Sequence, residues 1–176
     1  MGAIRVLSEA EVIGAFKDPR SLMRTDGSVD PAWERDILAV VHLPAPLPYA
    51  DGHGTMVRTV RVHERLFPIF LDLFADLYKS GLWETIGAFG GCYCWRQQRR
   101  ATKLSHHCWA IAIDMDVLDN PFMAVIPRVD ARVKQVMARH GFVWGGATIW
   151  GGAFPWARRD PMHWEFADLS LIREVA

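Results

Sequence analysis

Two short stretches of the chain place metal-binding side chains at strand spacing. The first covers residues 104–116, and from Trp109 onward it alternates between bulky apolar residues and small residues that lead to Asp114. A period of two puts these two sets on opposite faces of a strand. Asp114 therefore shares its face with residues no larger than alanine, which leaves room for a ligand. His107 comes just before the strand, where the chain can still turn its imidazole toward the same open face.

The second stretch reads Asp-Pro-Met-His-Trp-Glu-Phe and covers residues 160–166. His163 and Glu165 are two residues apart, so in a strand they point to the same side while their apolar neighbours point to the other. Two imidazoles and one carboxylate, with a fourth position for water, form the ligand set of a catalytic zinc site. A remaining carboxylate can then act as the general base for the metal-bound water.

A structural interpretation competes with this one. A histidine in a strand is usually a packed or surface residue, and aspartate and glutamate are mostly solvated. Short patterns also arise by chance. Spacing alone therefore leaves the metal site and the structural interpretation at about even odds.

The arrangement resembles a known family. Ser105-x-His107-x-x-Ala110-x-Ala112-x-Asp114 resembles the Ser-x-His-x-x-Gly-x-Ala-x-Asp signature of zinc D-alanyl-D-alanine carboxypeptidases and L-alanyl-D-glutamate endopeptidases, a group that includes vancomycin-resistance carboxypeptidases and phage endolysins. Asp-Pro-Met-His-Trp-Glu at 160–165 resembles the second signature of that family. The resemblance spans roughly residues 62–166, with both signatures in order.

The resemblance implies a role for several residues. The expected ligands of one Zn²⁺ ion are His107, Asp114 and His163. The expected catalytic residues are Glu165, as general base, and Arg96, which matches an arginine upstream of the first signature and would stabilise the oxyanion. The residues expected to contact the substrate or the ligands are Ser105, Arg99 and Asp160.

The sequence departs from the family at two positions. Ala110 stands where the first signature has glycine, and alanine tolerates a positive φ poorly. Arg100 stands where relatives often carry glycine. We therefore expect small differences in the backbone of the metal site and of the arginine loop.

The elements that position these residues are predicted to form an α+β fold. The resemblance implies a central antiparallel sheet that carries the zinc site and is flanked by helices, as in the hedgehog/DD-peptidase fold. Periodicity and capping predict helices over 9–17, 63–79 and 130–140, with Pro68 as a possible first turn of the second. Strands are expected over 37–43, 92–96, 109–115, 142–144 and 163–166. Loops are expected over 18–33, 44–54 and 145–156. The last is expected to wall the cleft, with Trp150 and Trp156 as either pocket aromatics or packing residues.

Length and composition predict one folded domain over residues 1–176, with an N-terminal part over 1–60 and a catalytic core over 62–166. The chain is 51% hydrophobic, which argues against disorder. Lys+Arg and Asp+Glu both number 20, so the charge gives no support for a nucleic-acid partner. The odd number of cysteines, at 92, 94 and 108, argues against a disulfide framework and favours packing roles.

The sequence also suggests where the protein acts. Charged residues interrupt the first ten positions, which do not resemble a signal peptide, and no apolar run is long enough for a membrane span. We expect synthesis in the cytoplasm, action on the cell wall after release, and a monomer, although the oligomeric state is open.

The resemblance, together with the metal-site spacing, implies a zinc metallopeptidase that cuts the stem peptide of peptidoglycan. Within this class, a carboxypeptidase that trims terminal D-alanine is the alternative to an endopeptidase. Outside it, the alternative is a binding module that keeps the fold and the zinc without catalysis. Retention of Glu165 and Arg96 argues against the binding module.

Overall fold

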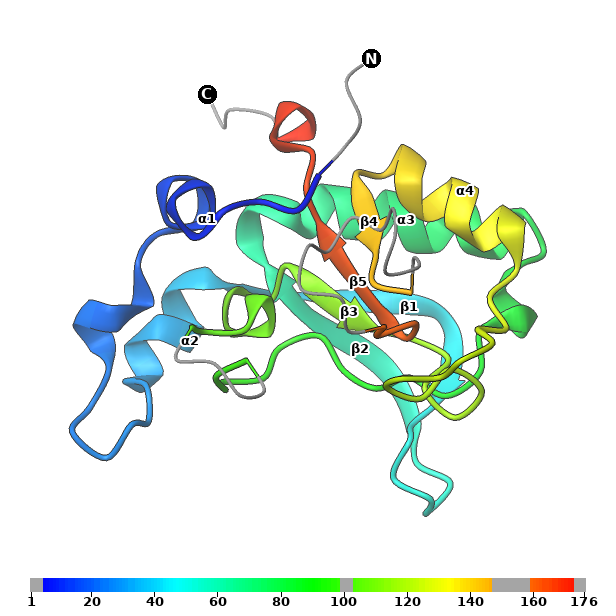
Figure 1. The fold of residues 1–176 in the computed structure, drawn as a ribbon, viewed down its shortest axis with the longest axis horizontal. Coiled ribbons are helices and arrows are strands. Elements are labelled where there is room, and N and C mark those ends of the chain that lie inside the picture. Colours follow the sequence, from blue (N-terminus) through cyan, green and yellow to red (C-terminus); the bar gives the residue numbers. More distant parts are fainter. Residues whose placement is uncertain (1–4, 99–102, 147–158, 173–176) are drawn as a thin grey trace.

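The structure, a computed structural model, describes residues 5–98, 103–146 and 159–172. Helices, short 3-10 turns and two small antiparallel sheets follow one another along the chain (Figure 1). The predicted α+β class is therefore confirmed. No helix in these residues is long and apolar enough to cross a membrane.

The first sheet is a hairpin of β1 (Leu38–Pro48) and β2 (Met56–His63), with an irregular register between His42 and Leu47. The predicted strand at 37–43 falls largely within β1. However, β1 continues through 44–48, which was expected to be a loop, and β2 was not predicted. Proline lacks an N–H donor and is tolerated on the edge of a sheet, and both strands of a two-stranded sheet have a free edge.

The helices largely follow their capping signals. Helix α1 (Glu9–Phe16) begins with the capping box of Ser8 and Glu11, and α4 (Ala131–Arg139) is capped by Asp130. Helix α3 (Phe67–Lys79) has Pro68 in its first turn and starts later than the predicted residue 63, because β2 ends at His63 and a 3-10 turn, η2 (Glu64–Leu66), lies between them. Helix α2 (Pro31–Ile37) was not predicted and begins inside the expected loop at 18–33.

The second sheet has the strand order β3 (Ala112–Asp114), β5 (His163–Phe166), β4 (Phe142–Trp144), and all its pairs are antiparallel. Strand β3 is shorter than the predicted 109–115, because a 3-10 turn, η4 (His106–Trp109), comes before it. The expected strand at 92–96 is also absent. That segment runs as extended chain between isolated bridges of Gly91 with Asp114 and of Gln97 with Leu104.

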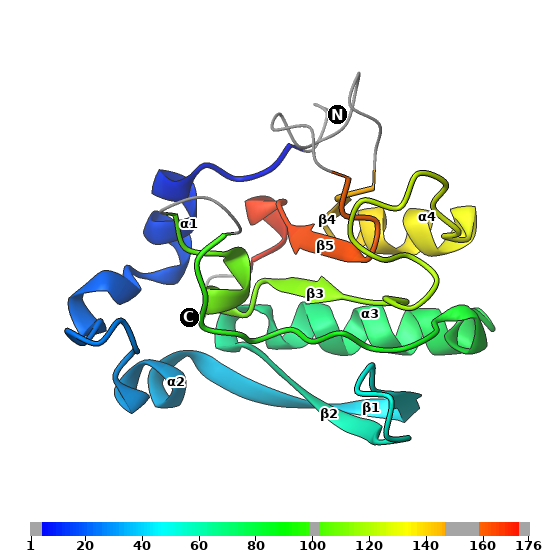
Figure 2. The ribbon, with the colours of Figure 1, turned by 60° about the horizontal axis from the view of Figure 1, so that its bottom comes forward.

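Helix α3 lies between the two sheets (Figure 2). It packs against β1, while the ring of Phe70 meets that of Phe142 on β4 at a centroid distance of 5.2 Å. Phe142 in turn meets Phe166 on β5 at 5.7 Å. These apolar contacts pack α3 against the second sheet and fix the strands that carry the candidate site.

Candidate metal centre

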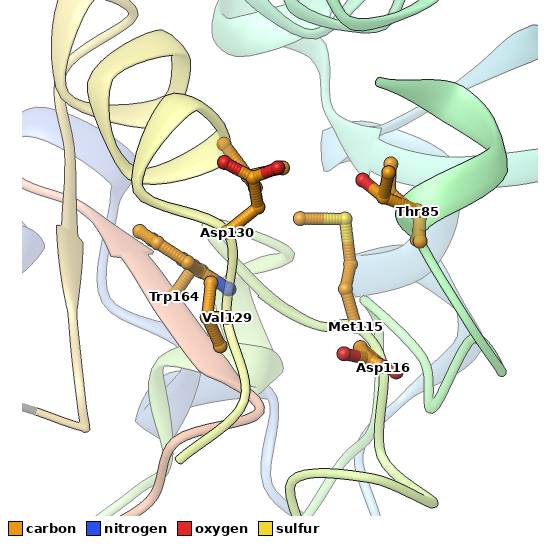
Figure 3. A pocket seen from close by; sticks show the side chains of 8 residues that line it. Thr85, Met115, Asp116, Val129, Asp130 and Trp164 are labelled. Atoms are coloured by element: carbon orange, nitrogen blue, oxygen red, sulfur yellow. The ribbon is translucent and has the colours of Figure 1, made fainter. Parts of the chain in front are cut away.

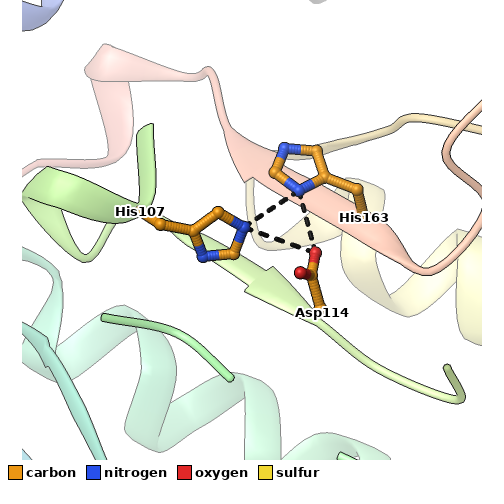
Figure 4. A group of neighbouring side chains, drawn as sticks. All are labelled: His107, Asp114 and His163. Carbon is orange, nitrogen blue, oxygen red and sulfur yellow. Dashed lines mark hydrogen bonds and ion pairs between the residues drawn. The ribbon is translucent and has the colours of Figure 1, made fainter. Parts of the chain in front are cut away.

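His107, Asp114 and His163 meet at one point of the second sheet (Figure 4). In the β3–β5 register, Asp114 lies directly opposite His163. Nε2 of His107 lies 3.2 Å from Nδ1 of His163 and 3.4 Å from Oδ1 of Asp114. Nδ1 of His163 lies 2.9 Å from the same Oδ1. Residues 56 positions apart in sequence thus converge on a single small triangle.

The triangle has the dimensions of a zinc site. Zinc binds imidazole nitrogen and carboxylate oxygen at about 2.0–2.2 Å, so neighbouring ligand atoms of a tetrahedral ion are about 3.3–3.6 Å apart. The three separations in the protein run from 2.9 to 3.4 Å. Two imidazoles and one carboxylate also match the usual composition of a catalytic site with one open position. The residues present therefore fit a zinc ion.

Both imidazoles are held so that their inner nitrogens face the triangle. Nδ1 of His107 lies 2.6 Å from the backbone carbonyl of Cys92, and Nε2 of His163 lies 3.2 Å from Oε2 of Glu165. A carbonyl and a carboxylate accept hydrogen bonds, so each outer nitrogen donates its proton away from the triangle. The inner nitrogens thus face a cation site, and the outer contacts follow the hydrogen-bonding pattern of metal-ligating histidines.

The charges of the site also favour a cation. Burial opposes charge on Asp114, but contacts with His107 and His163 hold its pKa well below the usual range. Burial lowers the pKa of His163, yet its hydrogen bonds with Asp114 and Glu165 raise it to about 10. Two buried carboxylates therefore stay ionised around an imidazole that retains a proton, and a metal ion can replace that proton.

Several contacts fix the turn that carries His107. The indole N–H of Trp33 donates to the carbonyl of Cys108 at 3.0 Å, and that of Trp109 donates to the carbonyl of Lys17 at 2.8 Å. The hydroxyl of Ser105 caps the turn by accepting from the backbone N–H of His107 at 3.5 Å. Ser105 thus contacts the backbone of a candidate ligand, one of the two kinds of contact expected for it.

The chain turns sharply between His107 and β3. Ala110 has φ 53° and ψ 36°, which is the left-handed region that glycine adopts most easily. This is the position where the family signature has glycine. The requirement for a special backbone angle is therefore present here, and an alanine satisfies it with some strain.

Glu165 lies beside the triangle rather than within it. Its Oε2 contacts the outer nitrogen of His163, on the far side of the ring from the atoms that face Asp114. Burial raises its pKa, but His106 and His163 lower it to about 2, so the carboxylate is ionised beside these two imidazoles. This geometry makes Glu165 an orienting partner of His163, and its role as general base stays a prediction.

Of the remaining predicted residues, the structure describes Arg96 and Asp160. Arg96 is half-buried, and its backbone accepts from Ser105 N–H at 3.0 Å and donates to the sulfur of Cys108 at 3.2 Å. Asp160 is half-buried, and its carbonyl accepts from the backbone N–H of His163 at 2.9 Å. Arg99, Arg100, Trp150 and Trp156 lie outside the described residues.

All three cysteines are free. Cys92 and Cys108 are buried, in line with packing roles, whereas Cys94 is exposed and does not pack as predicted. Cys92 contributes more than bulk, because its carbonyl holds the ring of His107.

The other face of β5 offers no comparable site. Trp164 stacks on Trp144 at a centroid distance of 5.9 Å. It lines a cavity of about 20 Å³ with Met115, Val129 and neighbouring residues (Figure 3). Such a cavity holds about one water molecule.

Sequence reasoning missed two supports of the site, Trp33 and His106. Trp33 is 75 residues away from its partner, and no local pattern signals that contact. His106 contacts Glu165. The sequence offered one weak indication of its importance, which is its place directly before the candidate ligand His107.

Comparison with known proteins agrees with the geometry. Residues 99–166 match the model of a family described as D-alanyl-D-alanine carboxypeptidase, which supports a place among the M15 peptidases. The matched segment contains all three candidate ligands together with Asp160 and Glu165, whereas Arg96 lies just before it. No curated protein and no solved structure matches the chain.

Proposed function

We propose that the chain is a zinc metallopeptidase that hydrolyses peptide bonds in the stem peptide of peptidoglycan. The orientation of the two imidazoles carries this proposal. Each outer nitrogen has an acceptor, and each inner nitrogen points at the carboxylate of Asp114. The family match adds the substrate class, since D-alanyl-D-alanine is a component of peptidoglycan stems.

In this proposal His107, Asp114 and His163 hold the zinc ion. When bound, zinc polarises a scissile carbonyl and lowers the pKa of a water molecule toward about 7. The protein contributes the fixed directions of its ligand atoms. The carbonyl of Cys92 and the carboxylate of Glu165 prevent either ring from rotating, so the ligands need little reorganisation on binding.

A carboxylate must still take the proton of the attacking water. Glu165 is engaged with the outer nitrogen of His163, so we assign this step to Asp160. Asp160 stands three residues before His163, and its backbone carbonyl accepts from the backbone N–H of His163 at 2.9 Å. It would receive the proton and pass it to the leaving amine.

Arg96 is the proposed donor to the oxyanion. The backbone of Arg96 forms hydrogen bonds with Ser105 and Cys108, which flank His107 in the sequence. The residue therefore lies next to the turn that carries this candidate ligand. An arginine can also bind the free carboxylates of a stem peptide with two parallel hydrogen bonds. We propose that it serves the substrate in one of these two ways.

The bond that is cut separates two versions of the proposal. An endopeptidase that cuts between L-alanine and D-glutamate needs a cleft that is open at both ends. A D-alanyl-D-alanine carboxypeptidase needs a cleft that is closed beyond the leaving residue. The family description favours the carboxypeptidase, and a zinc-containing binding module without activity is the remaining alternative.

Mass spectrometry of purified peptidoglycan after incubation with the zinc-loaded protein tests the function. Loss of terminal D-alanine is the result expected of a carboxypeptidase, and new L-alanine ends identify an endopeptidase. His107→Ala is the control and should release neither. If the wild-type protein binds one zinc ion and releases no product, the binding module is the better account.

Two variants identify the proton acceptor. Asp160→Asn should keep zinc and lose turnover by about two orders of magnitude or more. Glu165→Gln should instead weaken zinc binding. If Glu165→Gln keeps its zinc and loses turnover, Glu165 is the base after all. Its Oε1 is buried, has no hydrogen-bond partner in the described part of the chain, and would be the atom that takes the proton.

A further inference from the structure

Glu165 contacts a second histidine besides His163. Nδ1 of His106 lies 3.0 Å from Oε2 of Glu165, and the same oxygen lies 3.2 Å from Nε2 of His163. The three side chains are only 10%, 6% and 13% exposed. A single buried carboxylate oxygen therefore joins two imidazoles.

This contact links the two elements that carry the candidate ligands. His106 and His107 are consecutive residues of η4, whereas Glu165 and His163 lie two residues apart on β5. His106 thus shares η4 with the candidate ligand His107, and Glu165 shares β5 with the candidate ligand His163. Movement of η4 relative to β5 would break the bridge and displace His107 from His163 at the same time.

We propose that His106 is a positioning residue of the metal centre, which holds Glu165 against the outer nitrogen of His163 and so keeps the inner nitrogen directed at the metal. This inference rests on the proposed zinc site and adds a residue that neither motif specifies. His106 does not touch the metal or the substrate in this account, and it acts only through Glu165.

The surroundings of Glu165 make this bridge necessary. The carboxylate is buried, and its strand neighbours across the sheet are Ala112 and Val143, which have no polar side chain to offer. A buried carboxylate is costly unless it is paired. Without His106, His163 would be the one described partner of Oε2, and the carboxylate would be free to rotate away from the ring.

His106 also has space on its other side. It lines a cavity of about 200 Å³ together with Leu7, Gln98, Lys103 and neighbouring residues. Its ring meets the ring of Trp109 edge-on at a centroid distance of 6.3 Å. A substituted side chain at this position can therefore be accommodated without a collision in the core.

Two matched variants test the proposal. His106→Phe keeps a ring of similar size and removes the donor, whereas His106→Asn keeps a donor close to the position of Nδ1. The zinc dissociation constant is measured by competition with a chelator. In the zinc-loaded protein, ¹⁵N NMR of the imidazoles identifies the protonated nitrogen of His163 and the exchange rate of its proton.

We expect His106→Phe to bind zinc about tenfold or more weakly, in the range found for outer hydrogen-bonding partners of metal ligands. The Nε2 proton of His163 should exchange faster in this variant. His106→Asn should restore both properties toward the wild type. Unfolding temperatures of the zinc-free proteins show whether a variant has simply lost its fold.

Wild-type zinc affinity and an unchanged His163 proton in His106→Phe would overturn the proposal. So would an equal loss in His106→Asn and His106→Phe, because the hydrogen-bond donor would then be irrelevant. A failure of the proposed function looks different. In that case the wild-type protein itself would bind no zinc, or would bind zinc and release no product from peptidoglycan.

Discussion

Two buried histidines of this protein have opposite protonation behaviour. His63, at the end of β2, is 1% exposed and lies against the ring of Phe16 at 4.9 Å, and burial lowers its pKa to about 4. His163, on β5, is also largely buried, yet the carboxylates of Asp114 and Glu165 raise its pKa to about 10. The same side chain is a neutral core residue in one region and a cation in the other.

The difference teaches how to recognise the site. Burial alone favours neutral imidazole, so a protonated buried histidine needs negative charge built around it. Around His63 the neighbouring groups are a phenyl ring and the backbone N–H of Arg65, which donates to Nδ1 at 3.2 Å. Around His163 they are two carboxylates and a second imidazole. Only the second arrangement suits a bound cation.

The largest expected effect comes from removing a ligand. His107→Ala should reduce the zinc content from one ion per chain to nearly none, because two ligands do not make a zinc site. Zinc at a thousandfold excess over its dissociation constant should stabilise the wild-type protein by about 4 kcal/mol and this variant by none. Metal analysis and thermal unfolding with and without zinc measure both effects.

The control for this variant lies in the first sheet. His42 is exposed on β1, so His42→Ala should keep the zinc content and the stabilisation by zinc. Equal zinc content in His107→Ala and wild type would remove His107 from the site.

The second effect concerns the pH dependence of stability through His63. Its folded pKa of about 4 lies below the ordinary value, so the unfolded chain binds more protons between about pH 6.5 and pH 4. The free energy of unfolding should therefore fall as the pH decreases through this window, by roughly 2–3 kcal/mol from this residue. His63→Asn, which keeps an acceptor for the N–H of Arg65, should lose less stability over the same window.

Urea unfolding of both proteins at about pH 7 and pH 4.5 checks this prediction. If the free energy of unfolding falls by the same amount in both proteins between these pH values, the folded-state pKa of His63 is not lowered and the prediction is wrong.

A third, smaller effect tests the support of η4. Trp33→Phe removes the hydrogen bond to the carbonyl of Cys108 and leaves that buried group without its donor. We expect a loss of about 1–3 kcal/mol in the free energy of unfolding. Zinc affinity should fall as well, since the turn carries His107. A stability loss with unchanged zinc affinity would limit Trp33 to a role in packing.

The smallest expected effect is at Ala110. Ala110→Gly relieves the left-handed conformation, which costs a residue with a Cβ about 1–2 kcal/mol. It also removes a buried methyl group, which contributes about 0.8 kcal/mol. The variant should therefore be more stable by about 1 kcal/mol or less, measured by urea unfolding. A clear destabilisation would mean that the methyl group matters more than the backbone strain.

Local signals predicted the parts of the molecule that depend on neighbouring residues. The capping box at Ser8 and the cap at Asp130 located α1 and α4, and alternation at His163 and Glu165 located β5. The length of β1 and the existence of β2 depend on pairing between distant residues, which the proline-rich sequence of 44–48 obscured.

The candidate site was predictable to a similar extent. The types and spacing of His107, Asp114 and His163 suggested a metal triangle, which the structure brings together. The contacts of Glu165 were not predictable, because residues two apart on a strand show only a shared face. Glu165 contacts Nε2 of His163 and also contacts His106. Both contacts depend on side-chain packing between η4 and β5.

The number of protons released on zinc binding tests the central claim most directly. It can be measured by calorimetry in two buffers of different ionisation enthalpy, at about pH 6, below the pKa of about 7 of zinc-bound water. The carboxylates of Asp114 and Glu165 raise the pKa of His163 to about 10, so we expect it to carry the proton that zinc displaces. We predict one zinc ion per chain and at least one proton released, and no zinc binding in His163→Ala. Zinc binding without proton release, or with equal affinity in that variant, would contradict a metal centre built on His163.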